Sequence, residues 1–326
     1  MRVLVIGGAG YIGSVVTEQL IKGKHHVVVF DNLVQGHLEA VPAGAEFFLG
    51  DVANQEALES VFGRWPFDAV IDLAGETIVT DSMTNPFKYF KKNVVDGLNV
   101  LEAMVKYGVK RIIFSSTSAV YGEPETIPMP ENHRQEPGNS YGESKLIFEK
   151  MIKWYDYAFG IRFGILRYFN AAGASRNFGE DHRPETHLIP LVLQVALGQR
   201  EFLTIFGTDY ETPDGTCIRG YTQVEDLARA HILLLENLDK LGSKIYNVGT
   251  LKGYSVMEVI DCVREITGAQ IPAIRGPRRA GDVRVMVADS TKIRHELGWK
   301  PAYEDIHSIV KTAWDWHRRY PNGYSK

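Results

Sequence analysis

A tyrosine and a lysine four residues apart, Tyr141 and Lys145, form the pair in this sequence best suited to acid–base chemistry. In a helix this spacing places both side chains on one face. A nearby positive charge favours a phenolate and lowers the pKa of a phenol, which is about 10 in water. We therefore predict that Tyr141 is a general base for a substrate hydroxyl and that Lys145 lowers its pKa.

Hydroxyl side chains precede this pair in the run Ser115-Ser116-Thr117, at the end of an expected strand at 111–115. Doubly wound sheets bind their ligands at the carboxyl ends of the strands. We predict that these hydroxyls face a cofactor and that Thr117 assists Tyr141.

A glycine-rich turn lies between an expected strand at 3–6 and an expected helix at 11–22. Gly7, Gly10 and Gly13 let a phosphate approach the backbone and let the helix pack on the strand. The free amides at the helix N-terminus attract a pyrophosphate. A dinucleotide is the predicted ligand.

The next expected strand, at 26–30, is followed by Asp31 and Asn32, 18 residues after Gly13. A carboxylate at this distance meets the adenosine ribose hydroxyls, and it repels a ribose 2′-phosphate. The sequence therefore predicts NAD rather than NADP. The alternative is that Asp31 only caps a loop.

Asp51 and Val52 follow a third expected strand at 46–49. They are placed to border the adenine. An equally acceptable role for Asp51 is the N-cap of the helix expected at 55–62.

The composition of the 326 residues, 44% hydrophobic and 23% charged, is that of a soluble globular enzyme. A net charge of -4 gives no basic field for nucleic acid. We find neither a membrane-length apolar run nor a secretory signal, so we expect no membrane partner and a cytoplasmic location. Cys217 and Cys262 lie outside any Cys-x-x-Cys motif, and His-Glu-x-x-His is missing, so we expect no disulfide, no zinc site and no other metal.

Strand and helix patterns alternate through the first half of the chain, which predicts an α/β, Rossmann-like, doubly wound parallel sheet. Further strands are expected at 69–73, 111–115 and 161–166, and long helices at 86–107 and 141–159.

From residue 170 onward, loops and shorter helices predominate. The predicted division is an NAD-binding domain at 1–170, to which 219–248 returns, and a smaller C-terminal domain at 171–326 that mainly binds substrate. Helices are expected in this second part at 188–197, 255–267, 291–297 and 306–317.

Taken together, these segments resemble the extended short-chain dehydrogenase/reductase family, and within it the 4-epimerases of UDP-hexoses. The resemblance runs end to end. Besides the glycine turn and Asp31-Asn32-Leu33, it is carried by residues 115–122, 141–145, 166–174, 187–190, 206–210 and 217–219.

The resemblance implies a reversible 4-epimerisation of UDP-galactose and UDP-glucose through a transient 4-keto sugar, with tightly bound NAD and no net redox change. It also implies a homodimer formed through the helices at 86–107 and 141–159.

The resemblance further implies the residues of the site. The catalytic residues would be Thr117, Tyr141 and Lys145. NAD would be held by Gly7, Gly10, Tyr11, Ile12, Gly13, Asp31, Asn32, Asp51, Val52, Leu73, Ala74, Asn93, Ser115, Tyr141, Lys145 and Tyr168. The UDP-sugar would contact Thr117, Asn170, His187, Leu188, Thr204, Phe206, Arg219, Arg279, Asp282 and Met286. Arg278 is the alternative to Arg279.

Two departures from the family pattern affect this reading. Where Arg-Asp-Tyr-x-His-Val is usual, the chain has Arg219-Gly220-Tyr221-Thr222-Gln223-Val224, and the lost Asp and His are expected to loosen or reshape this loop. Asp72 stands where a histidine is usual, and we expect it to face solvent or to pair locally. An inward Asp72 would raise the pKa of Tyr141.

The sugar and the exact reaction stay open at this point. A 4,6-dehydratase or decarboxylase would carry an acid two positions after Thr117, where this chain has Ala119. A catalytically silent NAD-binding scaffold conflicts with the intact Thr117, Tyr141 and Lys145. A 4-epimerase of a UDP-N-acetylhexosamine, UDP-pentose or UDP-hexuronic acid is the remaining alternative.

Met286 is the residue that the resemblance places against the 2-substituent of the sugar. Its unbranched side chain would close this pocket only in part. We therefore expect weaker turnover of the N-acetylated pair, unless Met286 simply packs in a core.

Overall fold

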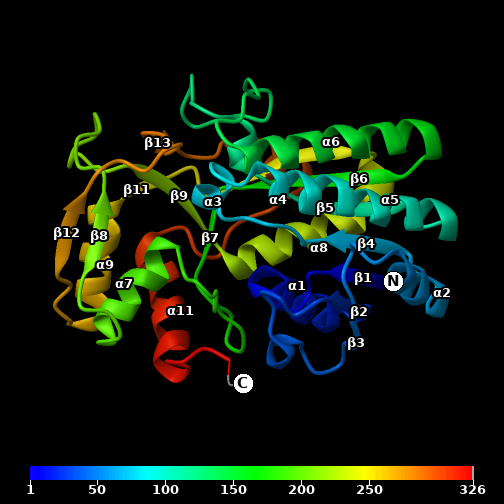
Figure 1. Ribbon diagram of the computed structural model, residues 1–326, viewed down its shortest axis with the longest axis horizontal. Coiled ribbons are helices and arrows are strands. Elements are labelled where there is room, and N and C mark those ends of the chain that lie inside the picture. Colours follow the sequence, from blue (N-terminus) through cyan, green and yellow to red (C-terminus); the bar gives the residue numbers. More distant parts are fainter. Residues whose placement is uncertain (325–326) are drawn as a thin grey trace.

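The computed structural model describes residues 1–324. A seven-stranded parallel sheet, on the right of Figure 1, lies between helices in one part of the molecule. The strand order is β10-β6-β5-β4-β1-β2-β3, and every neighbouring pair is parallel. The order changes direction beside β1, which makes the crevice between β1 and β4 the place where such sheets bind ligands. The predicted doubly wound sheet is confirmed. Its strands are β1 (Arg2–Ile6), β2 (His26–Asp31), β3 (Glu46–Leu49), β4 (Ala69–Asp72), β5 (Arg111–Thr117), β6 (Arg162–Tyr168) and β10 (Lys244–Val248).

Helices cover both faces of this sheet because its strands are apolar on both sides. In β1, Val3 and Val5 pack toward one face, against α1 (Tyr11–Lys22) and α8 (Val224–Leu241). Leu4 and Ile6 pack toward the other face. There they meet α2 (Gln55–Arg64), α5 (Asp96–Tyr107) and α6 (Ser140–Phe159). Burial on both faces fixes the sheet as the rigid support of the site.

The long helix predicted over 86–107 is present with these bounds, but a π-helical turn that the sequence did not predict lies at its centre. The segment consists of α4 (Pro86–Phe90), a π-helical turn at Lys91–Val95 and α5. Within the wide turn, the Asn93 amide accepts the N–H of Glu76 at 2.8 Å and donates to the Glu76 carbonyl at 3.1 Å. It also donates to Ser144 Oγ at 2.9 Å. A π turn adds a residue at a point where a side chain must be aimed.

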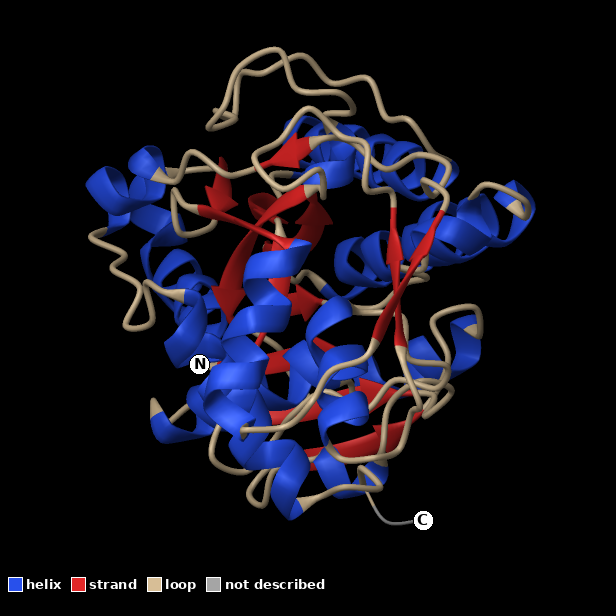
Figure 2. Cartoon of the chain, turned by 90° about the vertical axis from the view of Figure 1, so that its left-hand side faces the viewer, coloured by secondary structure: helices blue, strands red, loops and turns tan. Residues whose placement is uncertain are grey.

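A second part of the molecule lies beside the large sheet and has its own core (Figures 1 and 2). It holds a four-stranded sheet in which β9 pairs with β7, β11 and β13, and a two-stranded sheet of β8 and β12. The strands are β7 (Asn170–Ala172), β8 (Leu203–Phe206), β9 (Ile218–Gln223), β11 (Gly253–Ser255), β12 (Ala273–Gly276) and β13 (Val285–Met286). The helices are α7 (Leu188–Ala196), α9 (Val256–Thr267) and α11 (Ile306–Arg319), and α10 (Thr291–Leu297) packs near β10.

The chain returns to the large sheet later than the expected residue 219. Residues 219–223 belong to β9 in the smaller sheet, and α8 begins the return at Val224. β10 then pairs with β6. Residues 219–223 stay in the second part because β9 is hydrogen-bonded there to β7, β11 and β13.

Within the described residues, no helix has both the length and the apolarity that a bilayer crossing requires. The thiols of Cys217 and Cys262 are both free and buried.

Candidate active site

The glycine turn forms a cradle that larger residues would fill. Gly7 has φ +76°, in the left-handed region, and a Cβ there would lie 3.0 Å from the Ala74 nitrogen. A Cβ on Gly13 would lie 2.1 Å from the Gly7 carbonyl oxygen. The N-terminus of α1 opens directly onto this turn. This close approach of backbone to backbone fits the diphosphate of a dinucleotide.

Asp31 lies at the end of β2, beside the turn. Its carboxylate accepts the N–H of Ala9 at 3.0 Å and the N–H of Leu33 at 2.9 Å. Burial raises its pKa, although these backbone hydrogen bonds lower it. The carboxylate is therefore held in one orientation beside the glycine turn.

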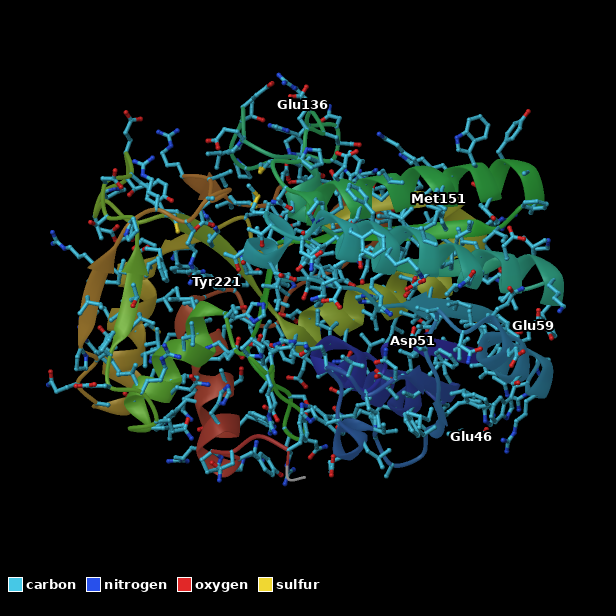
Figure 3. All side chains as sticks on the ribbon, in the orientation of Figure 1. Glu46, Asp51, Glu59, Glu136, Met151 and Tyr221 are labelled. Carbon is cyan, nitrogen blue, oxygen red and sulfur yellow. The ribbon has the colours of Figure 1, made fainter. Side chains whose placement is uncertain are left out.

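Asp51, which is labelled in Figure 3, follows β3. It accepts a hydrogen bond from the Asn32 amide at 2.8 Å. The alternative role for Asp51 as a helix cap is wrong, because Asn54 is the residue that accepts the N–H of Ala57 at the start of α2. Val52 is half-buried against the core of the large sheet.

Lys145 is buried where β4 and β5 end. Its Nζ donates to the carbonyl oxygens of Ser115 at 3.1 Å and Ala74 at 3.4 Å. Burial lowers its pKa to about 8, against the raising effect of nearby carboxylates. Leu73 and Ala74 also border Gly7, so the lysine and the glycine turn share one crevice.

Tyr141 stands at the first turn of α6, where Asn139 caps the helix by accepting the N–H of Gly142 at 2.8 Å. Burial raises the pKa of Tyr141, and the Thr117 hydroxyl lowers it. The expected drop in its pKa through Lys145 is not found. The lysine ammonium is instead held by two backbone carbonyls.

Tyr168, at the end of β6, is hydrogen-bonded to His231 and contacts the Ser115 side chain. The Tyr11 hydroxyl donates to the Gly173 carbonyl at 2.6 Å. Ile12 packs at the edge of the hydrophobic core between the large sheet and helices α1 and α8. Tyr11, Ser115 and Tyr168, which were all predicted to contact NAD, therefore lie at the same edge of the large sheet.

Asp72 does not face solvent as expected. It is 4% exposed at the end of β4, a central strand covered by helices, and it accepts the N–H of Ala74 at 3.1 Å. Burial raises its pKa to about 6, while the charge of Lys145 lowers it. Asp72 in turn raises the pKa of Lys145. The local pairing that we expected is present, but it is buried.

The predicted diphosphate and ribose contacts gather around β9. Arg219 lies 3.4 Å from the Asp282 carboxylate, and Asn170 donates to the Gly220 carbonyl at 2.9 Å. Arg279 stacks over the Phe206 ring, 4.1 Å from its centre. Arg278 pairs with Asp209 at 2.8 Å and covers Tyr210, so it is engaged elsewhere.

Met286 pairs with Arg219 in the β13–β9 ladder. Its half-buried side chain packs against a cluster that includes Val120 and Leu146, which follow Thr117 and Tyr141 along the chain. Thr204 and Phe206 both lie on β8. Leu188 is half-buried against the hydrophobic core of the second part of the molecule.

A sequence profile described as the NAD dependent epimerase/dehydratase family matches residues 3–249. The chain belongs to this family. A UDP-glucose 4-epimerase of Lacticaseibacillus casei is 48% identical over 327 residues, which is 99% of each chain. A solved UDP-glucose 4-epimerase superposes with a TM-score of 0.97 at 49% identity over all of both chains. Another, from Bifidobacterium longum in complex with NAD+ and UDP, gives a TM-score of 0.96 at 35% identity over 99% of this chain and 100% of that chain. The predicted resemblance is confirmed.

In this member of the epimerase/dehydratase family, Gln223 is held at the end of β9. Its side chain caps α8 by accepting the N–H of Glu225, and its amide donates to the Ala174 carbonyl at 2.8 Å. A looser or reshaped loop, expected from the lost Asp and His, stays a prediction, because these contacts concern Gln223 and not Gly220.

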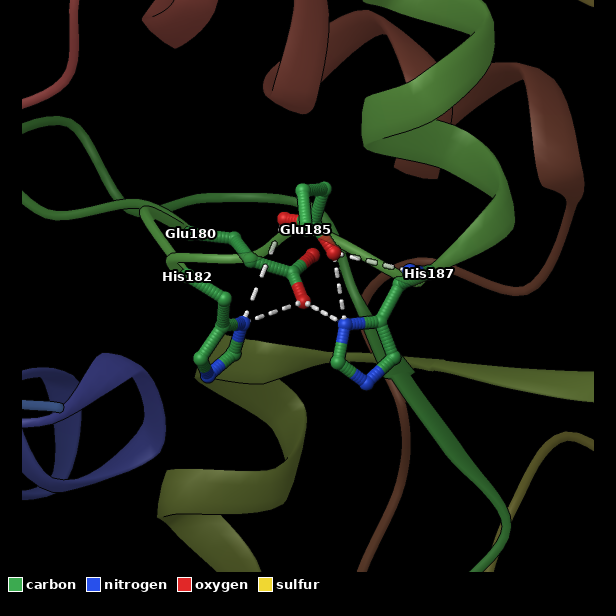
Figure 4. A group of neighbouring side chains, drawn as sticks. All are labelled: Glu180, His182, Glu185 and His187. Atoms are coloured by element: carbon green, nitrogen blue, oxygen red, sulfur yellow. Dashed lines mark hydrogen bonds and ion pairs between the residues drawn. The ribbon is translucent and has the colours of Figure 1, made fainter. Parts of the chain in front are cut away.

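His187 lies within a group of four side chains that sequence reasoning did not find (Figure 4). Its Nδ1 is 2.8 Å from Glu180 and 2.9 Å from Glu185, and the Nδ1 of His182 is 3.1 Å from Glu180. Burial lowers the pKa of His187, but the two carboxylates outweigh it and hold that pKa well above its usual range. The signal in the sequence was the close spacing of these residue types over 180–187.

Proposed function

We propose that this protein interconverts UDP-galactose and UDP-glucose by reversible 4-epimerisation through a transient 4-keto sugar, with tightly bound NAD. The observation that carries the proposal is the convergence of Tyr141, Thr117 and Lys145 on the crevice that also contains the glycine turn. The whole-chain similarity to UDP-glucose 4-epimerases supports it.

The residues present fit NAD. Gly7, Gly10 and Gly13 leave room for the diphosphate, and the carboxylate of Asp31 is aimed beside it. We assign the adenine side to Asn32, Asp51 and Val52, and the nicotinamide side to Leu73, Ala74, Asn93, Ser115 and Tyr168. When bound, NAD supplies the reversible oxidation at the 4-carbon of the sugar and a positive charge beside the site.

The chain's own contribution to chemistry centres on Tyr141 Oη, which takes the proton of the 4-hydroxyl and later returns one. Thr117 donates to that oxygen, which stabilises the phenolate. Because burial raises the pKa of Tyr141, positive charge near the phenol is needed to make it a base at neutral pH. We assign to Lys145 the role of holding the backbone of β4 and β5 in place beside Tyr141, and we assign the lowering of the Tyr141 pKa to the positive charge that bound NAD would add.

Substrate binding is assigned to the second part of the molecule. Arg219 and Arg279 suit a diphosphate because each guanidinium donates parallel, charge-assisted hydrogen bonds. Asn170 would contact a phosphate oxygen, and Asp282 a ribose hydroxyl. Thr204, Phe206, His187 and Leu188 would line the uridine. Binding energy from the nucleotide is the same for both sugar orientations, so the keto sugar can turn while it stays attached.

The sugar range depends on Met286. Its half-buried, flexible side chain favours a second activity on UDP-N-acetylhexosamines, weaker than the activity on hexoses. UDP-pentoses and UDP-hexuronic acids are further alternatives for the same site.

The test is to incubate purified protein, without added cofactor, with a panel of UDP-sugars and to separate the products by chromatography. We expect UDP-galactose and UDP-glucose to interconvert fastest, with slower turnover of the N-acetylated pair. Met286→Tyr should increase the ratio between these two rates. Conversion of only a pentose or a hexuronic acid would overturn the assignment of the sugar.

We also propose that residues 1–170 with 224–248 bind NAD and that the rest of 171–326 mainly binds the UDP-sugar. A homodimer through α4, α5 and α6 is supported by large exposed side chains on these helices, including Phe87, Trp154 and Tyr157. A cytoplasmic location is consistent with two free thiols.

A further inference from the structure

Two histidines and two glutamates from one loop, between β7 and α7, place their ligand atoms within 4.8 Å of one another (Figure 4). They are Glu180, His182, Glu185 and His187. We propose that this group binds one divalent transition-metal ion and that Zn²⁺ fits it best. The group shares His187 with the proposed uridine pocket but contains none of the side chains assigned to proton transfer, so the proposal does not depend on the proposed chemistry at the sugar.

The spacing of the donor atoms matches a tetrahedral site. The Nδ1 atoms of His182 and His187 lie 3.1 and 2.8 Å from Glu180 Oε1. Glu185 oxygens lie 2.9 Å from His187 Nδ1 and 4.0 Å from His182 Nδ1. In a tetrahedron with Zn–N and Zn–O bonds of about 2.0–2.2 Å, neighbouring ligand atoms are about 3.3 Å apart. Three of these separations are shorter than that value and the fourth is longer by about 0.7 Å, so the side chains would have to adjust around the ion.

Charge and ligand type also suit this metal. When the ion binds, the imidazoles must release any proton that they carry, and two carboxylates with two neutral imidazoles then give a charge that a dication balances. Imidazole nitrogen favours zinc over magnesium or calcium. The N-terminus of α7 opposes a cation, but its effective charge is only about half a unit.

The group is held in place and is accessible. Glu185 Oε1 accepts the N–H groups of Thr186 at 2.7 Å and His187 at 2.8 Å, which orients the carboxylate. Glu180 is 5% exposed, whereas about half of the His187 side chain is exposed, which leaves an entry path. Oriented ligands and an open path are what a bound ion requires.

The ion would connect two parts of the proposed active site. The His182 ring packs edge-on against Tyr11, the first residue of α1 after the glycine turn, with ring centres 6.2 Å apart. His187 immediately precedes α7. We assign the ion a structural role, in which it fixes this loop between the cofactor turn and the start of α7.

The test uses untagged protein that retains its own nucleotide, treated with a chelator and then titrated with Zn²⁺ and Co²⁺. We expect one equivalent to bind, and bound Co²⁺ to show the visible absorption of tetrahedral coordination. Zn²⁺ at 100 times its Kd should raise the Tm by about 5 °C. Mg²⁺ should not.

His182→Ala should weaken Zn²⁺ binding by about 100-fold or more and abolish the Co²⁺ absorption. Glu180→Gln should do the same, and it serves if His182→Ala fails to fold in the presence of chelator. The matched control is His295→Ala, an exposed histidine on α10, which should bind as wild type does. Wild-type protein without a Zn²⁺-dependent Tm, or equal affinities for the wild type and a folded site variant, would overturn the proposal.

Discussion

Among single residues, we expect turnover to depend most on Tyr141. We expect Tyr141→Phe to lower kcat by about 100-fold or more, the usual loss on removing a general base. UDP affinity should be retained, because the predicted nucleotide contacts lie on other elements. Steady-state rates with a parallel UDP titration separate the two effects. A folded Phe variant that turns over at the wild-type rate would require another base.

Asp72 provides a prediction about pH. Its pKa is about 6 in the folded protein against an ordinary value of 3.8, so between these values the folded state binds more protons than the unfolded chain. The contribution of Asp72 to stability is therefore lost as pH rises from about 4 to about 6, and the total is on the order of 3 kcal/mol. Asp72→Asn removes this effect and keeps an oxygen that can accept the Ala74 N–H.

We thus expect Asp72→Asn to be more stable than wild type at pH 7, with a smaller difference at pH 4.5. Urea unfolding midpoints of both proteins at the two pH values give the comparison. A variant that is less stable than wild type at pH 7 would show that pairing with Lys145 outweighs the cost of burying the charge.

The residue types of the site were predictable from the sequence, but their environments were not. Tyr141, Lys145 and Asp31 are apparent from spacing alone. The burial of Asp72 and the capture of the Lys145 ammonium by two carbonyls depend on how β4 and β5 end beside α6, which no local pattern records.

Among the elements, the strands and helices of the large sheet were predictable because apolar strand segments alternate with helical patterns along the sequence. The π turn at Lys91–Val95 was not, since its cause is the contact of Asn93 with Glu76 and Ser144 on other elements. The cluster around Glu180 and His182 was likewise hidden, because an irregular loop carries no period that indicates which side chains converge.

The glycine turn should tolerate no side chain at Gly13. Gly13→Ala would place a methyl group 2.1 Å from the Gly7 carbonyl oxygen, so the turn must move. We expect a loss of stability of about 1–3 kcal/mol, as for other overpacked sites, and a lower content of bound NAD.

The NAD content of Gly13→Ala is measured by denaturing the protein and quantifying the released nucleotide per chain. Gly138→Ala is the matched control, because a Cβ at Gly138 meets nothing within 4 Å. Full NAD occupancy in Gly13→Ala would remove the turn from the cofactor site.

At the scale of the whole molecule, the exposed aromatic side chains of α6 predict an interface between two copies of the chain. Trp154 is 69% exposed and Tyr157 is 84% exposed. Replacing both with glutamate should convert a dimer into a monomer, because it places charges in an apolar contact. Light scattering at micromolar concentration distinguishes the two states.

Tyr320→Glu, a change at the end of α11 and outside these helices, is the control and should remain dimeric. A wild-type protein that is monomeric at this concentration would contradict the proposed interface.

In the proposed reaction, the hydrogen on the 4-carbon of the sugar leaves and returns to the same carbon within one active site, without exchange with water. The most direct measurement uses UDP-galactose deuterated at C4, incubated in ordinary water with purified protein and no added nucleotide. The product UDP-glucose is then analysed by mass spectrometry and NMR. Our account predicts that nearly all of the deuterium is retained at C4, in the inverted configuration. Product that carries protium at C4, or no conversion by folded protein that retains its NAD, would contradict it.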